Sequence, residues 1–177
     1  MSAQSGDFKQ RLIEALEYSD EQNRENRADR LIWLSQFQTE GGLVAGRLEP
    51  LSLLEEARVC FMNGNFIAAL LTATSFIEQT LVVELEERAV VGPRGTLQKA
   101  IETARAANLF SSALLDGADQ LRLIRNPFVH RKPDEHTHSL GTRFRAQGVH
   151  PDSVLEADAR LALELMYGYF HSTLRRA

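Results

Sequence analysis

The stretch from 66 to 85 constrains the fold more than any other, because it is long, mostly apolar and helical in its spacing. Apolar residues lie around much of the circumference of this expected helix, so much of it should be buried. Polar residues interrupt the stretch, among them Thr72, Thr74, Ser75, Glu78, Gln79 and Glu84. These interruptions favour a buried helix of a soluble protein over a membrane span.

Helical patterns fill most of the remaining chain, and strand signals are nearly absent. The expected helices cover residues 7–18, 28–37, 51–63, 66–89, 96–107, 111–125 and 154–174. The segment 132–151 is polar and is expected to be a loop. The sequence therefore predicts an all-α fold, a bundle of four main helices with accessory N-terminal helices.

Helix-breaking residues predict where the chain divides. Three glycines and Pro50 fall within residues 39–50, which makes this segment the expected linker. It separates a helical N-terminal arm and linker, residues 1–49, from a main helical domain, residues 50–177. The polar run 19–26 is expected to interrupt the arm.

Helix ends are also predicted from single residues. Gly64 is expected to end one helix and Asn65 to cap the next. Asn126 precedes Pro127, which disfavours helical backbone at Asn126 and predicts a break there. Ser153 and Glu156 have the spacing of a capping box and predict the start of the last helix.

Composition limits the functional classes. The chain has 177 residues and a formal net charge of −4, so contact with nucleic acid would have to come from a local basic patch. The one cysteine, Cys60, has apolar neighbours and is expected to be a buried thiol in a reducing compartment. The N-terminus lacks the pattern of a secretory signal. We therefore expect a soluble, cytoplasmic protein that is not bound to a membrane.

Glu78 occupies an unusual place for a carboxylate, among apolar and small residues of the long central helix. A buried carboxylate needs a cation or a proton. Arg125, at the edge of the apolar stripe of its own helix, is the candidate partner, since a guanidinium keeps its charge. The alternative is that Glu78 lies solvated at the rim of the bundle and that Arg125 extends into water.

The segment "RNPFVH", from Arg125 to His130, resembles the Arg–polar–three residues–His motif of the HEPN superfamily (higher eukaryotes and prokaryotes nucleotide-binding domains). Residues 57–81, "ARVCFMNGNFIAALLTATSFIEQTL", are similar to the helical hairpin with a "GN" turn that precedes the motif in that family. The resemblance covers roughly residues 51–174. It implies a four-helix domain with the motif at a helix junction.

The resemblance also implies an activity, metal-independent cleavage of RNA that leaves a 2′,3′-cyclic phosphate. Such cleavage needs a base, an acid and a cation for the phosphorane. The His130 imidazole can act as base or acid and Arg125 suits phosphate oxygens, while Asn126 could orient a phosphate or hold the turn. One histidine cannot make both proton transfers at once. The resemblance therefore implies a homodimer with a composite site, in which Glu78 positions Arg125, and neither a cofactor nor a metal ion is expected.

Flanking basic residues extend this expected site. Arg131 and Lys132 follow the motif, and Arg143 and Arg145 flank an aromatic residue, a pattern typical of contacts with single-stranded RNA. An ordinary exposed loop is the alternative for all four. The segment "DEHTH", residues 134–138, contains two histidines and two acids, but a solvated loop explains it better than a metal site.

Three functions remain open at this point. The first is an RNA-cleaving toxin or phage-defence component of bacteria, restrained by an antitoxin or another regulatory protein. The second is a non-catalytic HEPN-like module that binds a nucleotide or a protein. The third gives the N-terminal arm, with Trp33 and Phe37, a role in assembly.

Overall fold

The structure, a computed structural model, describes residues 2–37, 48–90 and 95–174. Within these ranges the chain has seven helices joined by turns and loops, and no strand. The predicted all-α fold class is therefore confirmed. The chain forms two compact units, residues 1–38 and 39–177, and each is described by itself.

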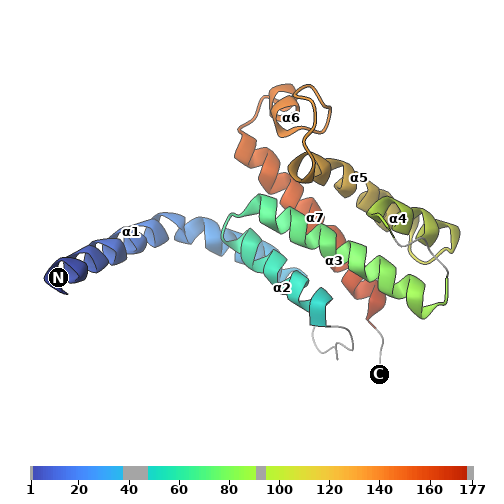
Figure 1. Cartoon of the computed structure of the whole chain (residues 1–177), viewed down its shortest axis with the longest axis horizontal. Coiled ribbons are helices and arrows are strands. Elements are labelled where there is room, and N and C mark those ends of the chain that lie inside the picture. The colour runs from blue at the N-terminus through green and yellow to red at the C-terminus, as the bar shows by residue number, and fades with distance from the viewer. Residues whose placement is uncertain (1, 38–47, 91–94, 175–177) are drawn as a thin grey trace. The chain divides into compact units, whose positions relative to one another are not determined.

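The first unit contains one helix, α1 (Ser2–Ser35) (Figure 1). The expected interruption at residues 19–26 is wrong, because the helix runs through it. This segment holds neither glycine nor proline, so nothing in it breaks a helix. The Asn23 side-chain amide donates to the Ser19 carbonyl at 2.7 Å. The Arg27 Nη1 atom lies 3.5 Å from the Asp20 Oδ1 atom, across two turns of the same helix. The polar run is thus a solvated stretch of continuous helix.

A helical hairpin opens the second unit, formed by α2 (Leu48–Met62) and α3 (Phe66–Glu87). Most of the expected linker, residues 39–47, lies outside the described residues, and residues 48–50 of that linker already belong to α2. Gly64 ends α2 as predicted, in a left-handed conformation with φ of 79°. The Asn65 amide then donates to the Cys60 carbonyl at 2.8 Å. Asn65 occupies the N-cap position of α3, but its side chain makes no capping hydrogen bond there, contrary to the prediction.

Cys60 lies on the inner face of this hairpin and is buried, as expected. Burial and the neighbouring Glu56 carboxylate raise the pKa of its thiol. The thiolate form is therefore disfavoured, which makes Cys60 an inert packing residue.

Two short helices and two longer ones complete the second unit. They are α4 (Leu97–Ala106), α5 (Ser112–Val129), α6 (Leu140–Gln147) and α7 (Pro151–Thr173). The expected capping box at the start of α7 is wrong. The helix begins three residues earlier than expected, at Pro151, whose fixed φ suits a first turn, and His150 is the N-cap. The His150 Nδ1 atom accepts from the Asp152 amide at 3.2 Å.

The core of the second unit surrounds α3, which packs against α2, α4, α5 and α7 (Figure 1). The largest fully buried side chains come from several of these helices and include Phe61, Leu70, Ile77, Leu81, Leu121, Leu163, Met166 and Tyr169. The expected burial of α3 on most of its sides is confirmed. By length and composition α3 could also span a membrane, with half of that stretch buried inside the fold; core helices share these properties, so this is weak evidence for a membrane span.

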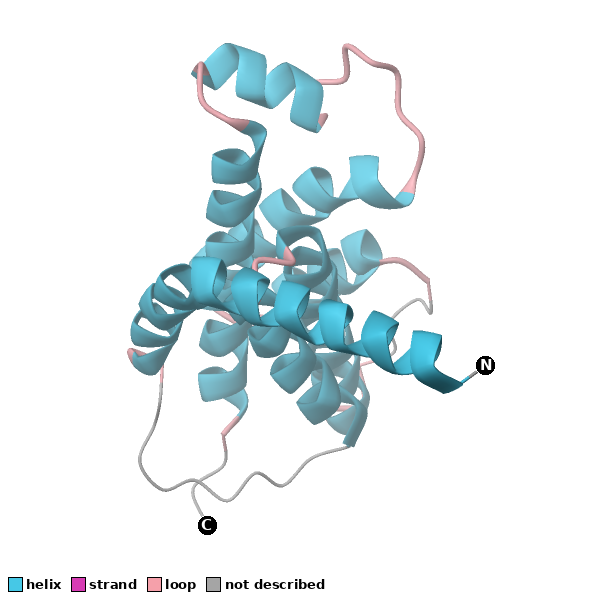
Figure 2. Cartoon of the chain, turned by 90° about the vertical axis from the view of Figure 1, so that its left-hand side faces the viewer, coloured by secondary structure: helices cyan, strands magenta, loops and turns pink. Residues whose placement is uncertain are grey.

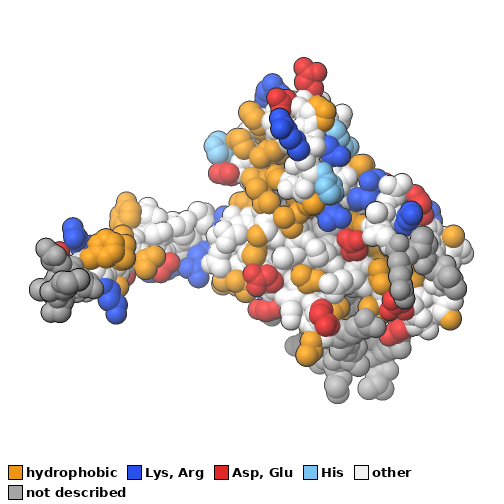
Figure 3. Space-filling model, viewed as in Figure 1, with side chains coloured by type: hydrophobic (Ala, Val, Ile, Leu, Met, Phe, Trp, Pro, Cys, Tyr) orange, Lys and Arg blue, Asp and Glu red, His pale blue; other side chains and the backbone are white. Residues whose placement is uncertain are grey.

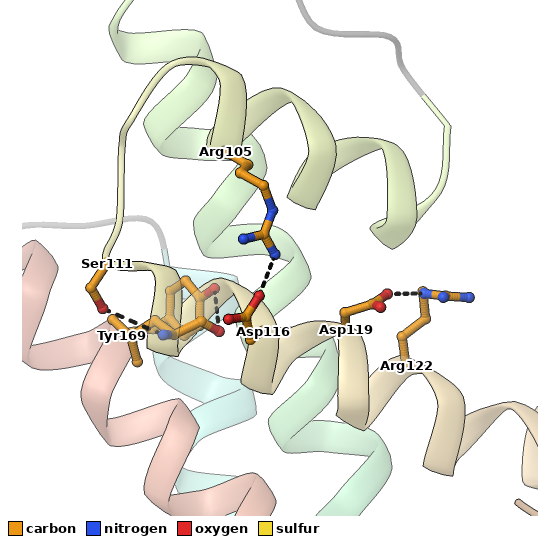
Figure 4. A network of polar contacts seen from close by, with 7 residues as sticks. Arg105, Ser111, Asp116, Asp119, Arg122 and Tyr169 are labelled. Atoms are coloured by element: carbon orange, nitrogen blue, oxygen red, sulfur yellow. Dashed lines mark hydrogen bonds and ion pairs between the residues drawn. The ribbon is translucent and has the colours of Figure 1, made fainter.

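A polar network joins α4, α5 and α7 at one end of this core (Figure 4). The Tyr169 hydroxyl donates to the Leu114 carbonyl at 3.1 Å, and Arg105 binds Asp116 at 2.7 Å. Ser111 caps α5 by accepting from the Leu114 amide. These contacts fix the start of α5, whose other end carries the motif.

Candidate functional site

The motif residues lie at the end of α5, and this helix runs further than the sequence predicts. It continues through Asn126 and Pro127 to Val129, so the expected break before the proline is wrong. A proline here removes one hydrogen bond, that to the carbonyl four residues earlier, and the helix ends only two residues later. Packing of Leu121 and Ile124, both buried, holds this last part of α5 in place.

Arg125 meets Glu78 across the core. The Arg125 Nη2 atom lies 3.5 Å from the Glu78 Oε2 atom of α3, with side chains 20% and 31% exposed. The expected pairing of these residues is therefore present, and Glu78 is neither free at the rim nor fully buried. The contact uses only one terminal nitrogen, while the Arg125 Nε atom is buried without a hydrogen-bond partner. Because the Arg125–Glu78 contact is long and single, the guanidinium keeps N–H groups that could donate to a phosphate oxygen.

His130 terminates α5 as its C-cap, with extended backbone at φ −129° and ψ 128°. Its amide donates to the Asn126 carbonyl at 2.8 Å, so the Asn126 main chain closes the helix. The His130 side chain is exposed. The exposed His130 imidazole at the end of the helix is therefore five positions along the chain from the Arg125 guanidinium on the helix.

The segment after His130 is not the long loop that the sequence predicts, because it contains α6. Ser139 caps this helix by accepting from the Thr142 amide, and Gly148 ends it with φ of 66°. Figure 2 shows α6 at the end of the second unit, beyond α5 and the start of α7. Lys, Arg and His side chains gather over this end, with some acidic groups among them (Figure 3).

The four predicted RNA-contacting residues differ in their surroundings. Arg131 is exposed and Lys132 is half-buried. Arg145 is exposed, and its Nε atom donates to the Gly141 carbonyl at 2.8 Å. Arg143 instead binds Asp158 of α7 with both terminal nitrogens. Arg143 therefore fits a role in holding α6 on α7 better than a role in substrate contact.

Asp158 is the residue that sequence reasoning missed at this end of the molecule. It is buried, with a side chain only 4% exposed, and it fills the same inward side of α7 as Val154 and Ala162. A signal was available, because Asp158 lies four residues from each of these apolar positions. Glu84 of α3 is also more buried than Glu78, and it lies 3.6 Å from Arg88.

A hollow of about 540 Å³ opens beside Glu78. Its lining comes from the start of α2 and the middle of α3, and consists of Glu49, Ser75, Glu78, Gln79, Val82 and Val83. Two carboxylates among six residues make the rim acidic. His136 and His138 lie elsewhere, with ring centroids 5.7 Å apart. In the described part of the chain, no group of three or more His, Cys, Asp and Glu residues could hold a metal ion.

Comparison with known proteins places the chain in no family. No family model, no curated protein and no solved structure matches it. The likeness to the HEPN superfamily therefore rests on the motif and the hairpin before it.

Proposed function

We propose that this protein is a metal-independent endoribonuclease of the HEPN type. The observation that supports it most is the end of α5, where Glu78 holds Arg125 at 3.5 Å while His130 is exposed as the C-cap. A cation held from the core and an exposed imidazole supply two of the three groups that metal-independent RNA cleavage requires, the cation and one group for proton transfer. In this proposal α2, α3, α5 and α7 are the four-helix bundle of the HEPN domain, within residues 50–177, and α1 is accessory.

The proposed reaction transfers two protons and exchanges one bond to phosphorus. One His130 accepts the proton of the 2′-hydroxyl as the 2′-oxygen attacks the phosphorus atom. The bond from phosphorus to the 5′-oxygen breaks, and a protonated imidazole gives its proton to that leaving oxygen. Arg125 stabilises the charge on the non-bridging oxygens, and Asn126 orients the phosphate. The products are a 2′,3′-cyclic phosphate and a free 5′-hydroxyl.

The proposed site is composite. One His130 cannot be base and acid in the same step, so two copies of the chain each contribute Arg125 and His130. Arg131, Lys132 and Arg145 would contact the RNA backbone beside the paired motifs. The homodimer is therefore part of the mechanism, since one copy holds half of the catalytic groups.

The proposed setting is the bacterial cytoplasm, with no membrane attachment. An RNA-cleaving protein there fits a toxin or a phage-defence component, and its activity would be restrained by an antitoxin or another regulatory protein. The motif resemblance supports this setting.

A non-catalytic binding module is the second candidate, and the hollow beside Glu78 is the observation that favours it. Its volume is within the usual range for small-ligand sites, roughly 300–1,000 Å³. The acidic rim of Glu49 and Glu78 disfavours a nucleotide phosphate. If the protein is such a module, a protein partner that offers a Lys or Arg side chain suits this hollow better than a nucleotide does.

The test is cleavage of varied RNAs by the purified protein at neutral pH with EDTA present. We expect cleavage with 2′,3′-cyclic phosphate ends, and its loss in His130→Ala with the fold retained. His171→Ala is the matched control, because His171 is also exposed but lies in α7 without a proposed role. Absence of cleavage by the wild-type protein, or unchanged cleavage by His130→Ala, contradicts the proposal. Binding of a protein partner that Glu49→Gln weakens would support the second candidate.

A further inference from the structure

Helix α1 carries an exposed apolar stripe on one side. Phe8, Leu12 and Leu16 are spaced four residues apart and are 58%, 49% and 65% exposed. Residues at this spacing share one side of a helix. Ile13 and Tyr18 flank the stripe and are 38% and 66% exposed. The apolar surface is thus concentrated between residues 8 and 18.

The same side of α1 becomes polar further along the helix, where Asn23 and Asn26 continue the row. The stripe is therefore a local feature of the first half of α1. Most helices in proteins gain their stability from packing an apolar side against a partner. An exposed run of large apolar side chains in water indicates a surface that a partner covers.

Charged residues are sorted by sign at the two ends of the stripe. Residues 7–11 contain Asp7, Lys9 and Arg11, two bases and one acid. Residues 17–21 contain three acids, Glu17, Asp20 and Glu21, and no base. Arg11 also lies 3.3 Å from Asp7, but these side chains are 67% and 72% exposed, so the pair is weak and leaves Arg11 able to bind elsewhere.

We propose that α1 pairs in antiparallel orientation with α1 of a second copy of this chain, through Phe8, Leu12 and Leu16. A two-fold axis near residue 14 lies midway between Leu12 and Leu16. It sets residues 7–11 of one copy beside residues 17–21 of the other. Lys9 of each helix, which borders the apolar side, then lies beside Asp20 of its partner, twice per pair.

Other occupants fit this surface less well. Parallel pairing sets Lys9 of one copy beside Arg11 of the other, which is repulsive. Residues 7–21 hold two bases and five acids, so RNA and anionic lipid surfaces would be repelled. The self-pairing of α1 does not rest on the ribonuclease proposal, since it uses no motif residue.

Thiol cross-linking of the full-length chain tests the orientation. In a Cys60→Ala background, chains with Lys9→Cys and chains with Ser19→Cys are treated with a short thiol-specific cross-linker, separately and mixed. Antiparallel pairing predicts a mixed product well above the product from either chain alone. Gln10→Cys mixed with Glu17→Cys is the control on the opposite side of the helix, and we expect little product from it. More product from the separate chains than from the mixture, or no product at all, overturns the proposal.

Charge reversal tests what drives the pairing. Ala15→Cys lies near the two-fold axis on the apolar side and reports pairing by its own cross-linking yield. We expect Lys9→Glu to lower this yield several-fold, and the further change Asp20→Lys to restore it, because these two residues border the apolar side. Far-UV circular dichroism checks that α1 stays helical in each variant. A yield that the first reversal leaves unchanged, or that the second fails to restore, contradicts pairing of this kind.

Discussion

Arg125 carries a charge that it cannot lose, and the fold meets that charge with a carboxylate from another helix. Glu78 and Arg125 are 47 residues apart in the chain, yet their side chains come within 3.5 Å. The pairing could be predicted from the sequence, because each residue interrupts an apolar pattern and needs the opposite charge. The looseness of the contact could not be predicted, since it depends on how α3 and α5 cross.

Replacing Glu78 by Gln tests this contact. We expect a loss of about 1 kcal/mol in the free energy of unfolding, since the pair is partly exposed and solvent screens it. Urea unfolding followed by circular dichroism measures the change. Glu55→Gln is the control, because Glu55 pairs with Arg58 on the surface and its side chain is 62% exposed. A loss no larger than that of the control would show that Glu78 does not hold Arg125.

Tyr169 links protonation to stability at high pH. Burial raises the pKa of its hydroxyl above the usual value near 10, and Arg105 lowers it by a smaller amount. Below pH 10 the hydroxyl is protonated in folded and unfolded chains, so its stabilising effect is complete. Above pH 10 the unfolded chain loses this proton first, so stability must fall as pH rises. Urea unfolding between pH 9 and about 11 should show this fall, and Tyr169→Phe should show a smaller one.

At the scale of whole helices, the caps and the close crossings decide where α5, α6 and α7 lie. Gly64 as the end of α2 was predictable, because only a residue that tolerates positive φ suits that place. Helix α6 was not, since residues 132–151 contain little apolar periodicity and no residue of α6 is buried. It is held instead by the Ser139 cap and by the ion pair of Arg143 with Asp158. Neither contact produces an apolar periodicity in the sequence. The run of α5 through Pro127 does not follow from the sequence, because the residue before a proline only prefers a non-helical conformation.

The crossing of α5 and α7 depends on Gly117. A Cβ atom at this position would lie 2.4 Å from Leu165 Cδ2 and 3.2 Å from its Cγ. We expect Gly117→Ala to destabilise the protein by about 1 kcal/mol, because the clash outweighs the gain in helix propensity. Gly141→Ala in α6 is the control, since no atom lies within 4 Å of its Cβ. Chemical denaturation measures both, and rescue of Gly117→Ala by Leu165→Ala would confirm the cause. A stabilised Gly117→Ala protein would show that Leu165 moves away freely.

The attachment of α6 depends on Asp158. Its carboxylate is buried and binds both terminal nitrogens of Arg143, so Asp158→Asn leaves a guanidinium poorly neutralised. We expect a loss of about 3 kcal/mol in stability and faster proteolysis within residues 131–150. Limited proteolysis with mass spectrometry locates the cut sites. Arg145→Lys, on the exposed side of α6, should leave both unchanged. An unaltered cleavage pattern in Asp158→Asn would mean that other contacts hold α6.

For the whole molecule, the helical class followed from the sequence and the arrangement of its parts did not. The apolar circumference of α3 predicts a central helix, and the structure places it among four others. The continuity of α1 is consistent with the sequence of residues 19–26, because this run is polar but contains no residue that breaks a helix. The proposed homodimer through α5 and the proposed self-pairing of α1 each involve two copies of the chain. Neither is visible in the packing of one chain.

The central claim is that catalysis needs the motif from two copies, and mixed dimers test it most directly. Wild-type and His130→Ala chains, unfolded together and refolded at fixed total concentration, form mixed dimers with one histidine each. RNA cleavage with EDTA present is then measured against the wild-type fraction. Because only dimers with two histidines should be active, the rate should fall as the square of that fraction. A linear fall, or no cleavage by the wild-type protein alone, would contradict the composite site.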